Sequence, residues 1–272
     1  MTGQKTVLSL VRSWPTLLRF LSLAGAVSLP IACGQAPVKS VDGSIVSTTL
    51  CADGYVHAIP DLTPRLAALS WQSRSTLSAT PEWLKTLPQT SPEREQALIW
   101  KDAFRVSSGG GGGDVDLTWG ENFEIVWQNL GELSEALNVE DPSEALKTRL
   151  QNLTPPKIQP KILYLNRSGA TAGPGTFVDA VIRAAGGVNL VETPGWQSPD
   201  TETLVQYSPD IILTSFMGSD YSGVNDRAIQ HAALAKKIDS LPKIDIPGKL
   251  WPCAGPGLID ATEELSKAMA DL

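Results

Sequence analysis

Two segments of the chain repeat each other at a constant offset of 107 residues, and this repeat constrains the fold more than any other feature. Residues 91–108 (SPEREQALIWKDAFRVSS) align without gaps with residues 198–215 (SPDTETLVQYSPDIILTS), so that Ser-Pro meets Ser-Pro and Glu95 meets Glu202. Each copy is typical of a serine-capped short helix that leads into a strand. Chance similarity between two such units is the alternative, but the shared Ser-Pro and the matched glutamate favour a true repeat. The sequence therefore predicts two related lobes.

Short strand-like segments alternate with helical patterns in both halves of the chain. Residues 44–50, 66–70 and 161–165 are typical of strands, whereas residues 51–59 and the stretch 176–185 are typical of helices. This alternation is typical of α/β proteins, in which helices cover a mainly parallel sheet. We therefore predict an α/β fold in each lobe.

The domain boundaries follow from the residues at which these patterns begin and end. We expect an N-terminal α/β lobe at 44–120, a helical connection with a bridging helix at 121–158, and a C-terminal α/β lobe at 159–272. Within the connection, apolar residues recur close to a period of 3.6, and Asp141-Pro142 then restarts a helix. The segment TPPKIQP at 154–160 ends that helix and marks a boundary.

The first residues of the chain differ in composition from the rest. Residues 1–32 contain three basic residues and no acidic one, and they end in the uncharged run FLSLAGAVSLPIA, which is typical of a secretory signal peptide. Cys33 follows Ala32 as in bacterial lipoprotein signals, although Leu29-Pro30-Ile31 departs from the usual pattern. We therefore predict export, with a tether at 33–43. Cys33 is a candidate lipid anchor, and ordinary cleavage nearby is the alternative.

Two further cysteines, Cys51 and Cys253, lie far apart in the sequence. In an exported protein such a pair can form a disulfide that bridges two lobes. Two ordinary buried cysteines are the alternative.

Two glycine-rich segments raise the question of a phosphate site. The loop SGATAGPGTF at 168–177 lacks the Lys that must follow the last glycine of a P-loop, and it lacks the G-x-G-x-x-G pattern of dinucleotide sites. We interpret it as a tight turn before a helix, on the rim of a cleft in the C-terminal lobe. The five glycines at 109–113 predict a flexible rim or a shortened loop, with an inert linker as the alternative.

The residues needed for catalysis or for a metal site are sparse. His57 and His231 are the two histidines of the chain, and no G-x-S-x-G nucleophile motif is present. Transition-metal sites usually need several His, Cys or carboxylate ligands, so two isolated histidines are more typical of packing or surface positions. We therefore predict no enzyme, no catalytic residue, no bound metal and no cofactor.

Tryptophans concentrate where loops follow strands. Trp71, Trp119, Trp196 and Trp251 all lie in loops or at strand ends, whereas Trp100 and Trp127 lie in periodic helical stretches and are expected in the core. For any single tryptophan a core position is the simpler interpretation. As a group, however, aromatic residues at the strand ends of two lobes predict an apolar cleft in which rings can stack on a ligand.

Four stretches of the sequence carry a family resemblance. They are SIVSTTLCADGYVHAI (44–59), TAGPGTFVDAVIRAAGGVNLVE (171–192), ETLVQYSPDIILTS (202–215) and LWPCAGPGLIDATEEL (250–265). Together they resemble periplasmic substrate-binding proteins of ABC importers for iron–siderophores, haem and cobalamin (vitamin B12). The third is the most specific, with a Glu seven residues before the Pro-Asp that opens a strand. The resemblance implies a class III periplasmic binding protein-like fold, in which two α/β lobes with mainly parallel sheets are bridged by a long helix and hold the ligand between them.

The same resemblance implies two residues for docking to a membrane permease. In the family, one surface glutamate on each lobe docks into arginine pockets of the permease. Glu202 matches the position on the C-terminal lobe, and the internal repeat gives Glu95 the position on the N-terminal lobe. There Asp102-Ala103 replaces Pro-Asp, so Glu93 is an alternative. Two ordinary solvated glutamates are the alternative, and the symmetric placement of the two residues on the lobes argues against it.

For the ligand, the resemblance implies a large chelate or macrocycle rather than a bare ion. The expected ligand-binding residues are Trp71, Arg74, Trp119, Arg167, Trp196 and Trp251. Arg74 and Arg167 follow strand ends and are suited to carboxylates or an anionic chelate, with solvated loop arginines as the alternative.

The function that follows is that of a periplasmic solute-binding component of an ABC importer, which captures a ferric siderophore, haem or cobalamin and delivers it to the permease. We expect a monomer whose contact with membranes runs only through a lipid anchor or the permease. A formal net charge of −7 argues against nucleic acid as the main partner. The alternatives are an exported α/β enzyme that uses the same cleft, and a lobe pair that has lost its ligand.

Overall fold

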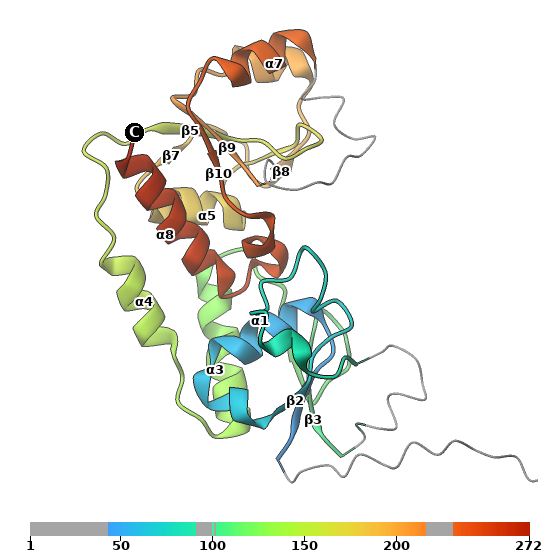
Figure 1. Cartoon of the computed structure of the whole chain (residues 1–272). Coiled ribbons are helices and arrows are strands. Elements are labelled where there is room, and N and C mark those ends of the chain that lie inside the picture. The colour runs from blue at the N-terminus through green and yellow to red at the C-terminus, as the bar shows by residue number, and fades with distance from the viewer. Residues whose placement is uncertain (1–42, 91–99, 101, 216–230) are drawn as a thin grey trace, which may run out of the picture. The chain divides into compact units, whose positions relative to one another are not determined.

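The computed structural model of the chain describes residues 43–90, 100, 102–215 and 231–272, which Figure 1 draws as coloured ribbons. The strands are β1 (Ile45–Ser47), β2 (Leu66–Ala68), β3 (Phe104–Ser108), β4 (Val115–Leu117), β5 (Lys161–Tyr164), β6 (Thr171–Ala172), β7 (Val188–Asn189), β8 (Trp196–Gln197), β9 (Ile211–Thr214) and β10 (Lys243–Asp245). The α-helices are α1 (Leu50–Ala58), α3 (Phe123–Leu137), α4 (Ser143–Gln151), α5 (Phe177–Ala184), α6 (Thr201–Gln206), α7 (Ala232–Asp239) and α8 (Gly257–Ala270). Short 3₁₀ helices are η1 (Pro60–Arg65), η2 (Leu84–Thr86), η4 (Gly248–Leu250) and η5 (Pro252–Ala254).

Two four-stranded sheets, each parallel throughout, form the framework of the described residues. Their orders are β2-β1-β3-β4 and β10-β9-β5-β7. Read from the opposite edge, the second sheet is β7-β5-β9-β10, so both sheets place their strands in the chain order 2-1-3-4. The α/β prediction with two related lobes is confirmed.

The internal repeat coincides with equivalent strands of the two sheets. Strand β3 begins at Phe104 and β9 begins at Ile211, which are one repeat offset apart, and each is an inner strand that pairs on both sides. The first copy's helical half, at 91–99, lies outside the described residues. The strand halves of the repeat therefore occupy equivalent positions in the two sheets, which indicates that the sheet is duplicated.

Polar caps fix the starts of several helices. The Thr176 hydroxyl accepts a hydrogen bond from the Asp179 N–H and begins α5, as the sequence predicts. In the connection, the Asn122 side chain caps α3, which buries Val126, Leu130 and Leu133 at helical spacing. Asn138 then takes a left-handed conformation that ends α3, and α4 follows as a separate helix. The predicted restart of the helix near Asp141-Pro142 is confirmed.

Apolar side chains cover both faces of each sheet. In β1, Ile45 belongs to the largest core cluster and the next residue, Val46, belongs to a smaller cluster with Ala68. In β5, Ile162 and Leu163 divide in the same way between the largest cluster and a cluster that contains residues of α6 and α7. Burial on both faces is what parallel sheets require.

A disulfide joins the two halves of the chain. Cys51, in the first turn of α1, is bonded to Cys253 of η5, 202 residues further along. The cysteines are therefore a bridge rather than two separate buried thiols.

Candidate functional site

The carboxyl ends of parallel strands are where open α/β sheets usually bind ligands. In the first sheet we call the segments that follow β2, β3 and β4 the rim loops (residues 69–74, 109–114 and 118–121). Trp71 and Trp119 lie in two of these loops and are 57% and 51% exposed. Both indole rings are therefore accessible at this edge of the sheet.

The second sheet carries an aromatic cluster at the corresponding edge. The ring of Trp196 lies 5.3 Å from that of Phe177 and 6.3 Å from that of Tyr164, both edge-on. Trp251 packs beneath the same two rings at 5.9 Å and 6.1 Å. Trp196 is 45% exposed, whereas Trp251 is 5% exposed and donates its indole N–H to the Ile246 carbonyl. Trp251 is therefore the buried base of the cluster, and Trp196 is its accessible face.

The sequence reasoning missed two members of this cluster. Tyr164 is the last residue of β5, and its hydroxyl lies 3.0 Å from the Ser215 hydroxyl just past β9. Phe177 is the first residue of α5. Their positions at a strand end and a helix start were the available signal, but each also fits an ordinary core pattern.

The glycine loop at 168–177 has a structural task that involves Trp196. It contains β6, which pairs antiparallel with β8 so that Ala172 lies opposite Trp196. A Cβ added to Gly173 would lie 1.9 Å from the Thr193 carbonyl oxygen, so no larger residue fits there. The loop glycine therefore permits close backbone packing that holds Trp196, a role the sequence did not indicate.

The two predicted arginines differ in their contacts. Arg74 donates hydrogen bonds to the carbonyls of Lys85 and Leu87, at 3.1 Å and 3.3 Å. It therefore ties the first rim loop to η2 and to the residue that follows it. Arg167 is half-buried just past the end of β5, as expected.

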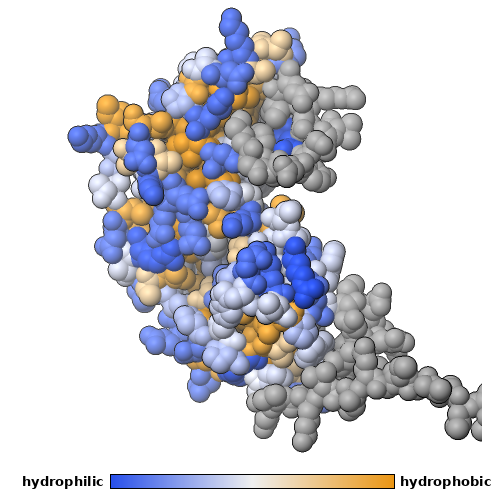
Figure 2. All heavy atoms as spheres, in the orientation of Figure 1, coloured by the Kyte–Doolittle hydropathy of each residue, from blue (hydrophilic) through white to orange (hydrophobic). Residues whose placement is uncertain are grey.

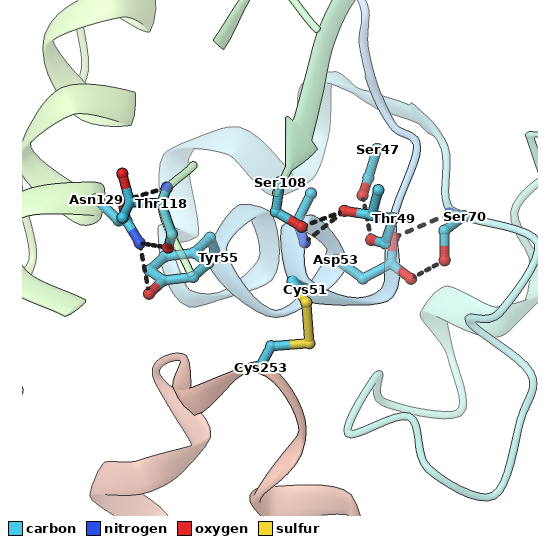
Figure 3. The surroundings of a disulfide bond; sticks show 11 residues. Ser47, Thr49, Cys51, Asp53, Tyr55, Ser70, Ser108, Thr118, Asn129 and Cys253 are labelled. Atoms are coloured by element: carbon cyan, nitrogen blue, oxygen red, sulfur yellow. Dashed lines mark hydrogen bonds between the residues drawn. A yellow bond between two sulfur atoms is a disulfide. The ribbon is translucent and has the colours of Figure 1, made fainter. Parts of the chain in front are cut away.

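Figure 3 shows how α1 is attached to the first rim loop and to the end of β3. The hydroxyls of Thr49 and Ser108 lie 2.8 Å apart, which ties the start of α1 to the end of β3. The Asp53 carboxylate accepts hydrogen bonds from the Ser70 N–H at 2.9 Å and from the Ser70 hydroxyl at 2.6 Å. Burial raises the pKa of Asp53 to about 6, although hydrogen bonds from Ser47 and Ser70 partly oppose the shift. Sequence reasoning missed this network.

A second buried network attaches α1 to the third rim loop. The Asn129 amide of α3 donates to the Tyr55 hydroxyl at 2.9 Å and to the Thr118 carbonyl at 2.8 Å, and it accepts from the Thr118 N–H at 3.0 Å (Figure 3). Burial raises the pKa of Tyr55 to about 12, so the phenol stays protonated. Helix α1 and the rim loops are thus fixed to one another.

The glycine run at 109–113 is a folded loop. The Asp116 carboxylate accepts hydrogen bonds from the N–H groups of Gly110 and Gly111 and from the Ser107 hydroxyl, at 2.8, 3.2 and 2.7 Å. The Gly113 N–H in turn donates to the Ser107 hydroxyl. The glycine run therefore has a defined conformation, because a carboxylate on the neighbouring strand β4 organises the loop.

A cavity of about 590 Å³ lies beside the disulfide, and we call it the side cavity. Residues of α1, the segment 77–80, α4, η4 and the start of α8 line it, and none of the predicted ligand residues does. Arg149 also lines it and pairs with Glu263 and Asp260, at 2.6 Å and 2.7 Å. His57 also lines the cavity, and burial lowers its pKa.

The remaining predicted residues are placed as follows. Glu202 is exposed in the first turn of α6, whereas Glu95 and Cys33 lie outside the described residues.

Within the described ranges, no cluster of three or more His, Cys, Asp or Glu side chains is arranged to hold a metal ion. In the same part of the chain, no helix is both long and apolar enough to span a bilayer. Figure 2 shows hydrophilic and hydrophobic residues interspersed over the face that it presents.

Solved structures resemble this arrangement over most of its length. The periplasmic haem-binding protein HutB of Vibrio cholerae matches 84% of this chain and 98% of its own, with a TM-score of 0.66 and 16% identity. A periplasmic haem-binding protein of Pseudomonas aeruginosa matches 85% and 94%, with a TM-score of 0.60 and 22% identity. The vitamin B12-binding protein BtuF of Vibrio cholerae matches 83% and 96%, with a TM-score of 0.53 and 17% identity. The chain has the two-lobed α/β fold of the class III periplasmic binding proteins.

Sequence similarity is more local. A cobalamin-binding protein of Halobacterium salinarum is 37% identical over 60 residues, which are 21% of this chain and 16% of that protein. No family model matches the chain. The structural likeness therefore covers most of the chain, and the sequence likeness covers one short segment.

Proposed function

We propose that the protein is the solute-binding component of an ABC importer, which captures a metal chelate between two lobes and delivers it to a membrane permease. The observation that carries this proposal is the exposed aromatic surface at the carboxyl ends of both parallel sheets, on a class III binding-protein fold. The similar structures are of binding proteins rather than enzymes, which favours a role without catalysis.

The ligand class is a ferric siderophore, haem or cobalamin. Rings such as those of Trp71, Trp119 and Trp196 offer flat apolar contact area with little loss of conformational freedom, which suits a large, partly planar ligand. Proteins named for haem and vitamin B12 binding share the fold, and a protein named for cobalamin binding shares a sequence segment.

Within this site the predicted residues divide by role. Trp71, Trp119 and Trp196 contact the ligand, and Arg167 offers charge to a carboxylate or anionic group. Arg74 and Trp251 support the site from behind, because their polar groups bind backbone carbonyls.

The first test compares two tryptophan variants. Trp196→Ala removes the accessible face of the aromatic cluster, and we expect it to weaken ligand binding about tenfold or more, since one buried aromatic contact contributes on the order of 1–3 kcal/mol. Trp127→Ala is the matched control, because Trp127 stacks on Phe123 and lies under Lys147 on the α3 surface. Titration with hemin, cyanocobalamin and a ferric siderophore, followed by tryptophan quenching, measures both. Equal affinities in the two variants would refute the assigned site.

Docking to the permease is proposed for Glu202 and Glu95. Exposed carboxylates that meet arginine pockets give orientation and specificity more than affinity. Glu202→Ala is expected to reduce ligand uptake by cells several-fold while ligand affinity in solution stays unchanged. Glu132→Ala, which removes an exposed carboxylate from α3, is the control. If Glu202→Ala instead weakens ligand binding in solution, Glu202 belongs to the ligand site and its docking role is wrong.

The cellular setting belongs to the same proposal. We infer export by a signal peptide at 1–32, a tether at 33–43 with Cys33 as a candidate lipid anchor, lobes at 44–120 and 159–272, and a monomer in the periplasm. Mass spectrometry of the protein purified from membranes distinguishes an acylated Cys33 from ordinary cleavage.

A further inference from the structure

The disulfide is attached to the rim loops through α1. Cys51 lies in the first turn of that helix, between Thr49 and Asp53. Thr49 holds the end of β3, Asp53 holds the loop after β2, and the buried Asn129 network holds the loop after β4 (Figure 3). Because each attachment is short and at least partly buried, α1 and the rim loops must move together.

On its other side the disulfide is attached to the aromatic cluster. Cys253 lies two residues after Trp251, whose ring packs on Tyr164 and Phe177 beneath Trp196. A continuous chain of contacts therefore runs from Trp196 through Trp251 and the disulfide to α1, and on to the loops that carry Trp71 and Trp119.

The backbone at Cys253 is held in an unfavourable conformation. Cys253 and Ala254 have φ angles of 71° and 45°, which residues other than glycine rarely adopt. Such residues persist only where the surroundings hold them. Here the surroundings include Gly120, at which an added Cβ would lie 2.4 Å from the Ala254 carbonyl oxygen, and Tyr55, whose ring lies beside Gly255. We call residues 251–257 the joint segment.

The space beside the joint segment leaves room for movement. Both cysteines line the side cavity, together with α1 on one side and η4 and α8 on the other. A packed core resists displacement, whereas a cavity of about 590 Å³ does not. The disulfide thus lies at the edge of the side cavity, where the joint segment is not packed against other side chains on every side.

We propose that the Cys51–Cys253 disulfide is a conformational clamp that holds α1 and the rim loops against the joint segment, and thereby fixes the spacing of the aromatic groups on the two sheets. The expected effect on ligand affinity rests on the proposed function, whereas the restricted movement of the joint segment does not. Opening the clamp requires a two-electron reductant such as a dithiol, which becomes a disulfide while the protein gains two thiols.

Hydrogen exchange of the ligand-free full chain tests the clamp. Three samples are compared: the oxidised protein, the same protein after treatment with dithiothreitol, and the Cys51→Ser, Cys253→Ser double variant. We expect amide protection in the joint segment and in residues 50–54 to fall about tenfold or more in the two opened forms, while β5 and β9 keep theirs. Arg149→Met is the control, because it breaks the ion pairs between α4 and α8 in the same cavity without touching α1.

Two results would overturn the proposal. One is unchanged protection in the joint segment of both opened forms, which would mean that packing alone holds it. The other is a uniform loss of protection in both sheets of the reduced protein, which would make the disulfide a general stabilising bond. Reoxidation with recovery of protection supports the clamp, since it excludes irreversible unfolding.

A second measurement separates the clamp from the ligand hypothesis. If hemin, cyanocobalamin or a ferric siderophore binds the oxidised protein, the opened forms should bind the same probe several-fold more weakly, chiefly through faster dissociation. Unchanged affinity would refute the coupling to the ligand site. Binding of no probe to the oxidised protein would refute the proposed function, and the exchange results would still decide the clamp.

Discussion

At the scale of single residues, Asp53 is a carboxylate whose pKa is raised by folding. Its pKa rises from 3.8 to about 6 on folding, because burial disfavours the charged form more than the hydrogen bonds from Ser47 and Ser70 favour it. Between these two values the unfolded chain has released a proton that the folded chain still holds. The free energy of unfolding is therefore expected to fall as the pH rises from about 4 to about 6, by on the order of 3 kcal/mol for this group.

Replacing the carboxyl group with an amide should remove that pH dependence. In Asp53→Asn, the amide oxygen can accept from the Ser70 N–H and the NH₂ group can donate to the Ser70 hydroxyl, so both contacts survive. We expect the variant to be about 1–3 kcal/mol more stable than the parent at pH 8 and equal to it near pH 4. Urea unfolding at the two pH values measures this, with Asp61→Asn as the control for losing one exposed carboxylate. A variant that is less stable than the parent at pH 8 would show that the ionised form is favoured.

At the scale of elements, one buried amide holds two helices and a strand end together. Asn129 is fully buried and makes three hydrogen bonds, to Tyr55 of α1 and to both backbone groups of Thr118. Asn129→Ala leaves these partners without a hydrogen bond in the core, so we expect the free energy of unfolding to fall by about 2–4 kcal/mol.

The matched variant for this prediction is Tyr55→Phe, which removes a single partner. It should cost about 1 kcal/mol, since the Asn129 amide keeps its bonds to Thr118. Denaturant unfolding of both variants provides the comparison. A cost below about 0.5 kcal/mol for Asn129→Ala would mean that water or a shifted side chain replaces the network.

The sequence predicted the elements better than the contacts between them. The repeat, the strand-like segments and the Thr176 cap led to two mainly parallel sheets, because these patterns are local, but they did not indicate the short strands β4, β7 and β10. The Asp53–Ser70 and Asn129–Tyr55 contacts join residues 17 and 74 positions apart, so no local pattern marks them. The pairing of β6 with β8 was missed for a similar reason, since two-residue strands have no periodicity.

At the scale of the whole molecule, the candidate site could be predicted in part. Tryptophans in loops or at strand ends were identified from the sequence; Trp71 and Trp119 are exposed in the loops that follow β2 and β4, and Trp196 is exposed at the start of β8. Trp251 follows the same rule in sequence but is buried, because its ring packs under Tyr164 and Phe177. The disulfide remained one of two alternatives until the fold brought α1 and η5 together.

Capture of a chelate by this arrangement is the function proposed for the protein. It is tested most directly by calorimetric titration of the purified protein with hemin, cyanocobalamin and a ferric siderophore. We predict saturable binding of at least one of them with a dissociation constant in the micromolar range or below, equivalent to about −8 kcal/mol or more favourable. Absence of saturable binding by all three would contradict the claim.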